Sequence, residues 1–191
     1  MEDLKHFMVK GSPMLADMVF IRDRHGEDGL QQVFDAMPPE VAQEYRKKLL
    51  ASSWYTMEFR IHLLTAVNKV FAKGNMDYFW ELGCHQAEHN IKNYYKTFMR
   101  MVGPKRIMSM APLFWGLIYK SSHIELKAEE KLAEVKVFDY PKAPIYNCQV
   151  VRGYLHRTAE IAGDEKNNVR STEPTCLNRG DQQCCYLLQW D

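Results

Sequence analysis

Three of the five cysteines lie in one short segment near the end of the sequence, EPTCLNRGDQQCC, which runs from Glu173 to Cys185. Cys176 and Cys184 flank a turn that contains Gly180, so both sulfurs can lie on one side of it. Thiolates and carboxylates are ligands of zinc, which takes four in a structural site. The spacing is consistent with a metal site, and equally with free cysteines that fill the core.

A fourth ligand has to come from another part of the chain. Cys148 lies on the apolar stripe of a helix expected just before these strands, so its sulfur should face the sheet. Cys185 points to the opposite face of its strand from Cys184 and is left out. The candidate metal ligands are Cys148, Glu173, Cys176 and Cys184. Because such a set carries surplus negative charge, we expect Arg179 in the intervening turn to lie nearby.

Two hydrophobic patterns divide the chain. Up to about residue 122, apolar residues recur at three- and four-residue steps, which indicates helices. These helices are expected at residues 25–37, 39–50, 54–71, 76–102 and 107–119, and the last is expected to be buried and kinked near Pro112. After residue 122 apolar and polar residues alternate, which indicates strands. Strands are expected at residues 123–128, 133–137, 168–176 and 184–190, with a helix at 144–163 between the two pairs.

The expected fold class is therefore α+β, with N-terminal helices packed on a C-terminal antiparallel four-stranded sheet that has a β-β-α-β-β tail. Residues 1–191 are expected to form a single domain, with the helical part at about 1–122 and the sheet part at about 123–191.

Composition excludes several classes of function. The formal net charge of +1, with basic residues dispersed among acidic ones, argues against a nucleic-acid partner. No apolar run approaches the length of a membrane span, and the N-terminus does not resemble a signal peptide. An odd number of cysteines without disulfide spacing favours a cytoplasmic protein. Since the sequence has no nucleophile elbow, phosphate loop or dinucleotide fingerprint, we do not expect an enzyme.

The C-terminal half resembles a 4-vinyl reductase-type small-molecule-binding domain. The resemblance rests on the pattern C-x3-G-D-x2-C-x5-W, formed by Cys176, Gly180, Asp181, Cys184 and Trp190. It also rests on C-x4-G-Y, formed by Cys148, Gly153 and Tyr154. The segment HGEDGLQQVFDAMPPE is similar to stand-alone, myxobacterial-type proteins built on the same domain.

The resemblance implies a TRAPP-like fold, related to haem–NO sensor domains, with a hydrophobic ligand cavity between the helices and the sheet. In similar aromatic-sensing domains of bacterial activators, a structural zinc is held by a helix Cys and a Glu-x-x-Cys-x7-Cys segment. These positions correspond here to Cys148, Glu173, Cys176 and Cys184. The resemblance therefore favours zinc over buried thiols. Haem is not expected, because the sequence lacks a Tyr-x-Ser-x-Arg motif and no His stands out as an axial ligand.

Aromatic residues on the expected helices could line the cavity or simply pack in the core. The candidate ligand-binding residues are Trp115, Tyr119, Phe98, Tyr95 and His85. The resulting hypothesis is a non-enzymatic sensor of a small hydrophobic or aromatic molecule, stabilised by zinc, that signals through a homodimer or a partner protein. The resemblance leaves two alternatives open, an enzyme accessory in tetrapyrrole reduction and a TRAPP-like scaffold or lipid-binding protein.

Overall fold

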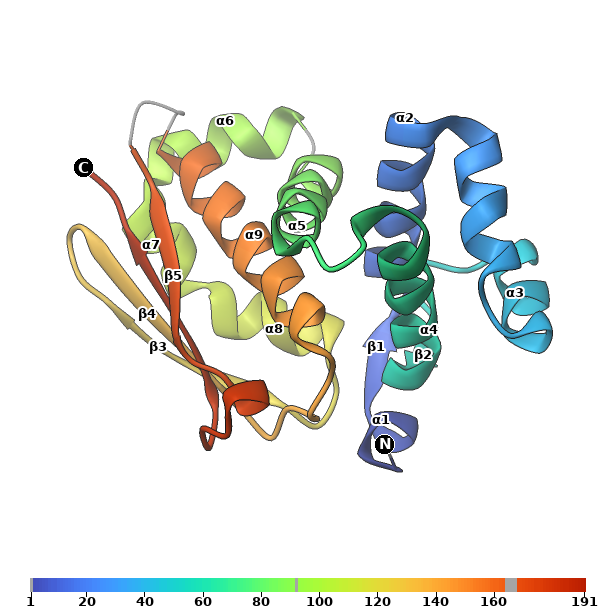
Figure 1. Cartoon of the computed structure of the whole chain (residues 1–191). Helices are drawn as coiled ribbons and strands as arrows, with labels where there is room; N and C mark the ends of the chain where they lie inside the picture. Colours follow the sequence, from blue (N-terminus) through green and yellow to red (C-terminus); the bar gives the residue numbers. More distant parts are fainter. Residues whose placement is uncertain (1, 92, 164–167) are drawn as a thin grey trace.

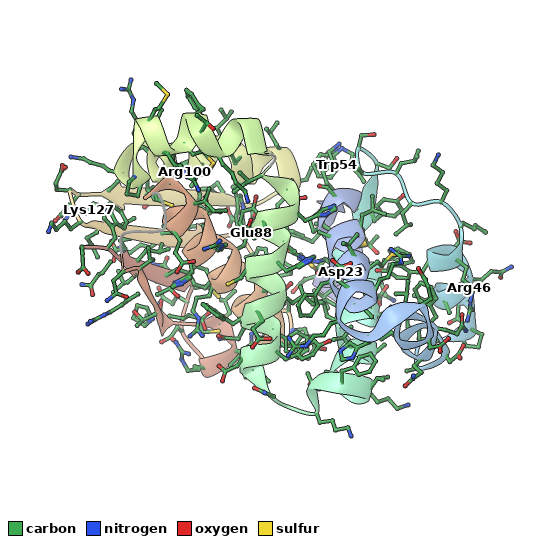
Figure 2. The ribbon with its side chains drawn as sticks, turned by 90° about the horizontal axis from the view of Figure 1, so that it is seen from above. Asp23, Arg46, Trp54, Glu88, Arg100 and Lys127 are labelled. Atoms are coloured by element: carbon green, nitrogen blue, oxygen red, sulfur yellow. The ribbon has the colours of Figure 1, made fainter. Side chains whose placement is uncertain are left out.

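Helices and a four-stranded sheet pack in successive layers (Figure 1). The structure is a computed structural model that describes residues 2–91, 93–163 and 168–191. Helix α9 (Ile145–Ala162) lies against the sheet, and α5 (Met76–Asn90) lies on α9. Viewed from above, α5 with Glu88 separates the N-terminal helices, marked by Asp23, from the C-terminal half, marked by Lys127 (Figure 2).

The sheet confirms the predicted fold class. Its order is β3-β4-β6-β5, and every neighbouring pair is antiparallel. The strands are β3 (His123–Ala128), β4 (Leu132–Phe138), β5 (Arg170–Thr175) and β6 (Cys184–Gln189). Ala133, Val135 and Val137 on β4 are buried, whereas the residues between them are only partly covered, as the alternation predicts.

The N-terminal part contains more than the expected helices. Its elements are α1 (Glu2–His6), β1 (Met8–Lys10), α2 (Gly11–Asp35), α3 (Pro39–Arg46), β2 (Trp54–Thr56) and α4 (Met57–Val67), which continues as a π-turn, η1 (Asn68–Ala72). The helix expected at residues 25–37 is the second half of α2, which is kinked at Gly26. Strands β1 and β2 form a small antiparallel ribbon, and residues 54–56 were expected to be helical. This pairing joins segments more than forty residues apart, so no local pattern reports it.

The middle helices are shorter than predicted. The helix expected at 76–102 is divided into α5 and α6 (Asn93–Val102), and Ile91 between them has an extended backbone. The apolar segment 107–119 also forms two helices, α7 (Pro104–Ser109) and α8 (Ala111–Ile118), which meet at Met110. Pro112 in the first turn of α8 is compatible with a helix start and explains the break.

Two glycines allow α5 and α9 to approach closely. A Cβ atom on Gly83 would overlap the carbonyl oxygen of Val150 and lie 2.9 Å from the backbone nitrogen of Tyr154. A Cβ atom on Gly153 would overlap the carbonyl oxygen of Trp80. The thiol of Cys84 donates across the same crossing to the Gly153 carbonyl oxygen at 3.4 Å. The two backbones are therefore in direct contact where the N-terminal and C-terminal halves meet.

A buried ion pair lies at the centre of the same junction. The side chains of Arg60 on α4 and Asp17 on α2 are fully buried, with Arg60 Nε 3.4 Å from Asp17 Oδ2. Arg60 Nη1 donates to the Tyr119 hydroxyl and to Asn147 Oδ1, both at 3.3 Å. Gln86 on α5 also donates to Asp17. The network connects α2, α4, α5 and α9 through hydrogen bonds that satisfy the charged groups.

Among the helices that the structure describes, none combines the length and the apolar character that a membrane crossing requires.

Candidate metal centre

Four side chains from three separate segments meet beside the first turn of α9. One donor atom from each of Cys148, Glu173, Cys176 and Cys184 lies within 4.8 Å of the other three. The sulfur atoms of Cys148 and Cys176 are 3.7 Å apart. All three cysteines are buried, and the Glu173 side chain is only 2% exposed. The four predicted ligand residues therefore lie together. Small movements of their side chains would bring all four donor atoms to bonding distance of one ion.

The turn between β5 and β6 positions two of the sulfurs. The backbone nitrogen of Cys176 donates to Asp181 Oδ2 at 2.7 Å, and a 3-10 turn (Leu177–Arg179) follows. The turn ends at Gly180, whose φ of 93° is in the left-handed region. Asn178 Nδ2 donates to the Ala143 carbonyl oxygen at 2.7 Å, which attaches the turn to the segment before α9.

Replacing Gly180 tests this turn. Gly180→Ala should lower the free energy of unfolding by about 1 kcal/mol, because a Cβ atom disfavours the left-handed conformation. Gly180→Asn should cost less, since Asn tolerates that conformation better than Ala. Urea unfolding curves of the three proteins measure the difference. Equal stability of Gly180→Ala and the natural sequence would contradict this backbone conformation.

The thiols of the cluster differ in acidity. The hydrogen bond between the two sulfurs lowers the pKa of Cys176 to about 5 and raises the pKa of Cys148. Burial, together with the nearby Cys176 sulfur, raises the pKa of Glu173 to about 8. Cys176 is thus the group most ready to act as a thiolate, the form that binds metals.

One carboxylate oxygen of Glu173 has no hydrogen-bond partner. Its Oε2 accepts a hydrogen bond from Gln149 at 3.3 Å and lies 3.7 Å from Arg179 Nη1. Its Oε1 is buried and has no hydrogen-bond partner. A buried carboxylate oxygen without a partner is costly unless a cation meets it. Arg179 lies beside the acidic ligand, where the surplus charge of the set predicted a cation.

The other two cysteines lie outside the cluster. The Cys185 sulfur is buried on the other side of β6, 3.9 Å from Glu134 Oε1, as the strand alternation predicted. Cys84 lies at the crossing of α5 and α9, where burial raises the pKa of its thiol to about 12. Neither thiol competes for an ion at the cluster.

The proposed ligand-binding residues lie in different places. Trp115 and Tyr119 are buried with ring centroids 4.3 Å apart. Phe98 on α6 is 52% exposed, and His85 on α5 lies 3.1 Å from Asp23 on α2. The side chain of Tyr95 lies outside the described residues. None of the other four lines the clefts at Trp80 and at Trp190, and the role of all five in ligand binding stays a prediction.

The sequence interpretation missed several polar residues that the fold brings together. Arg60 is three residues after Met57 and four before Leu64, so it occupies the buried face of its helix, and this spacing was an available signal. The interpretation also missed a group of three side chains that line a cleft and come from two helices far apart in the sequence. They are Trp80, Arg152 and His156. Nothing local in the sequence indicates that these three side chains are neighbours.

No protein-family model matches the sequence, and no curated protein matches it. Solved structures do share the fold. An H-NOX protein from Shewanella oneidensis in the Fe(II)NO ligation state has a TM-score of 0.69 at 11% identity, covering 95% of this chain and 99% of that chain. The Fe(II) unliganded H-NOX protein from K. algicida has a TM-score of 0.70 at 9% identity, with coverages of 95% and 96%. An oxygen-binding H-NOX domain related to soluble guanylate cyclases has a TM-score of 0.66 at 12% identity, with both coverages 95%.

The resemblance to 4-vinyl reductase domains is wrong, since the structural neighbours are H-NOX domains. The physical reason lies in the motif itself. Gly180 and Asp181 form a hairpin turn, and buried Trp190 donates from Nε1 to the Glu130 carbonyl oxygen at 3.0 Å. A pattern that meets the needs of a hairpin does not identify one family. The tetrapyrrole-reduction and TRAPP-like alternatives lose their basis with it.

The expectation of zinc as the cofactor is contradicted by the same comparisons. The neighbouring structures are described by Fe(II) ligation and by haem distortion, and no zinc is shown. Three thiols and a carboxylate select soft or borderline ions as a class and do not single out one of them. Across nearly its whole length, this chain has the fold of H-NOX domains.

Proposed function

We propose that residues 1–191 form one non-catalytic sensor module that binds a small molecule and signals through a protein partner. The fold supports this proposal, because the solved proteins that share it include NO-ligated and oxygen-binding forms. One core cluster that extends from Leu4 to Trp190 supports a single module. A ligand would act by binding one conformation of the module more tightly than another.

The observation that carries the proposal is the position of α9. Its first turn supplies Cys148 to the cluster, and its middle contacts the backbone of α5 at Gly153. Asn147, on the same helix, accepts a hydrogen bond from Arg60 on α4. A small shift of α9 would therefore be felt at the sheet, at α5 and at the N-terminal helices together.

The described residues do not fit a haem group. Haem requires an apolar cavity and an axial ligand such as His that faces it. Between α8 and α9 the rings of Trp115, Tyr119 and Tyr140 pack with centroids 4.3 to 5.7 Å apart, and the Arg60 network adjoins them. Among the described histidines only His156 is buried, and its Nε2 lies 3.2 Å from Glu160. The proposed ligand is therefore not haem.

The cluster of Cys148, Glu173, Cys176 and Cys184 is proposed to hold a metal ion in a structural role. With four protein ligands no position is left for a reacting water, which is typical of ions that stabilise a fold. The ion would fasten the start of α9 to β5 and β6. A bound ion stabilises the folded state by about 2.7 kcal/mol at a hundred times its Kd.

Exposed apolar side chains support a protein partner or a second copy of this chain. Met101 on α6 is 83% exposed, and on α8 Leu113 and Leu117 are 62% and 58% exposed. Leu113 and Leu117 are one turn apart on the same helix, and exposed apolar pairs of this kind are typical of contact surfaces.

Elemental analysis of the purified protein tests the metal site. The natural protein should carry about one metal ion per chain, and Cys176→Ser should lose at least nine tenths of it, because the most acidic thiol is removed. Mass spectrometry with an inductively coupled plasma measures the amount and identifies the element.

Cys185→Ser is the matched control. It removes a buried sulfur from the next residue after a proposed ligand, so it should retain the ion. Chelation should also weaken the hydrogen-exchange protection of the first turn of α9 in the natural protein. Equal metal content in Cys176→Ser and Cys185→Ser would refute the site.

A further inference from the structure

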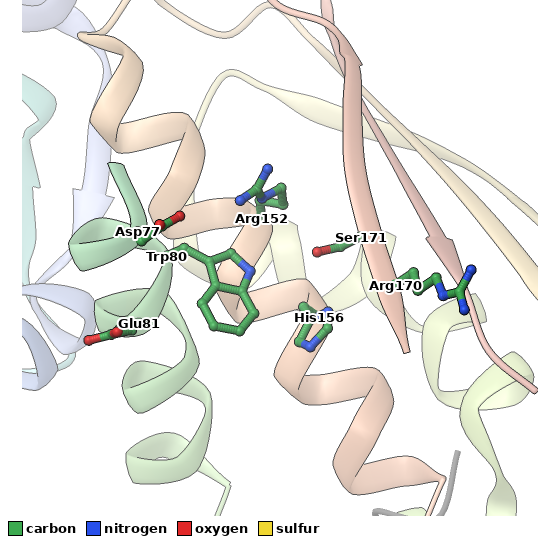
Figure 3. Close-up of a pocket in the computed structure, with 7 residues that line it drawn as sticks. All are labelled: Asp77, Trp80, Glu81, Arg152, His156, Arg170 and Ser171. Carbon is green, nitrogen blue, oxygen red and sulfur yellow. The ribbon is translucent and has the colours of Figure 1, made fainter. Parts of the chain in front are cut away.

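A cleft of about 490 Å³ lies between α5, α9 and β5, away from the cysteine cluster (Figure 3). Trp80 forms one wall from α5, His156 and Arg152 form the floor from α9, and Ser171 borders it from β5. This surface is named the α5–α9–β5 cleft below. Neither the metal cluster nor the aromatic interior contributes to it.

His156 lines the cleft and has an unsatisfied buried acceptor. The residue is 8% exposed, and its Nδ1 is buried without a hydrogen-bond partner. Its Nε2 lies 3.2 Å from a carboxylate oxygen of Glu160, which can only accept, so Nε2 carries the proton. Burial lowers the pKa of His156, which favours the neutral ring. In the neutral ring Nδ1 has a lone pair, and no donor among the described residues reaches it.

Arg152 has a donor that lacks an acceptor. Its Nε atom is buried without a hydrogen-bond partner, and guanidinium nitrogens can only donate. No carboxylate of the described residues forms a salt bridge with Arg152. An oxygen that carries negative charge is the acceptor that suits this group best.

The remaining groups define the body of a ligand. The indole of Trp80 stands at 63° to the His156 ring with centroids 5.0 Å apart. It is only partly buried, so it offers apolar surface to a flat group in the cleft. Glu81 is paired with Arg24 on α2, so its charge is already neutralised. Asp77 at the rim is exposed and has no salt-bridge partner among the described residues, so it can accept from an amine or hydroxyl.

From these groups we infer that the α5–α9–β5 cleft binds a small aromatic carboxylate that also carries a hydroxyl or amine donor. The carboxylate meets Arg152, the donor meets His156 Nδ1, and the ring lies against Trp80. This inference rests on the proposed function, because it names the ligand class of the sensor. The site lies one to two turns along α9 from Cys148, so its occupant contacts the helix that the cluster holds.

Titration with 3-hydroxybenzoate tests the inference on the whole chain. Isothermal titration calorimetry should detect saturable binding, and benzoate and phenol should each bind at least tenfold more weakly, because each lacks one complementary group. In nuclear magnetic resonance spectra of the natural protein, 3-hydroxybenzoate should shift the amide signals of Arg152, His156 and Ser171. This second measurement needs no variant to fold.

Two variants separate the site from general charge attraction. Arg152→Gln should weaken binding at least tenfold. Arg106→Gln is the matched control, since exposed Arg106 on α7 does not line this cleft, and it should change the affinity less than twofold. Equal losses in both variants would overturn the inference, as would failure of 3-hydroxybenzoate to bind the natural protein, which would leave water as the only partner of these groups.

The experiments distinguish failure of the cleft proposal from failure of the sensor proposal. If 3-hydroxybenzoate binds but leaves hydrogen exchange in α9 and α5 unchanged, the cleft stands and the sensor function is wrong. If it does not bind while the metal analysis succeeds, the ligand class is wrong and the sensor module is not affected.

Discussion

Gly83→Ala and Gly153→Ala should each lower the free energy of unfolding by about 3 kcal/mol or more. In both cases the new methyl group would collide with a carbonyl oxygen of the facing helix, and not with a side chain that can move. The helices would have to separate along their whole crossing, which would break the Cys84 hydrogen bond to Gly153 as well. Urea unfolding followed by circular dichroism measures the loss.

Gly116→Ala is the control for these substitutions. Gly116 lies within α8, and a Cβ atom there would meet nothing within 4 Å. Because alanine favours helices, this change should stabilise the protein by up to about 1 kcal/mol. If the unfolding free energy of Gly83→Ala is no lower than that of Gly116→Ala, the backbones of α5 and α9 are not in contact.

Removing one partner of the buried Arg60–Asp17 pair should cost about 3–5 kcal/mol, because it leaves the other charge buried and uncompensated. Arg60→Met leaves the carboxylate of Asp17, and Asp17→Asn leaves the guanidinium of Arg60. The double variant Asp17→Asn with Arg60→Met should lose less than the sum of the two single losses. A double-mutant cycle of unfolding free energies measures this coupling.

The two single variants should respond differently to pH. Burial raises the pKa of Asp17, and Arg60 opposes that effect. Since the folded-state pKa lies above the unfolded value, the contribution of this group to stability is present at low pH and lost as the pH rises through the folded pKa. Without Arg60 the folded pKa rises further, so Arg60→Met should recover stability on acidification relative to Asp17→Asn. Parallel pH profiles would contradict the pairing.

The sheet and the helix that crosses it could be predicted because their signals are local. The alternation in 123–128 and 133–137 and the turn at Gly180 depend on neighbours only a few residues away. The break at Ile91 was missed because apolar periodicity continues through it. At Met110 a kink was expected near Pro112, and the structure has a full break between two helices. The β1–β2 ribbon was missed because its strands recognise each other across the intervening helices.

The candidate site was predicted in part for the same reason. Glu173, Cys176 and Cys184 belong to one hairpin, and Cys148 could be added because the helix face that carries it was readable. The sulfur of Cys148 lies 3.7 Å from that of Cys176, which is 28 residues further along the chain, and the resemblance pointed to the same pair. The resemblance nevertheless named the wrong family, since hairpin requirements had produced the motif.

Helix α9 has consequences for how this protein can change over evolution. Twelve of its eighteen residues are buried, and they are divided among the cluster, the crossing with α5, the polar network and the cleft. A substitution that improves one of these tasks will usually disturb another. Substitutions that adapt the protein to new ligands are therefore expected on the facing surfaces of α5 and β5. Side chains there, such as Asp77 and Ser171, take part in fewer structural interactions.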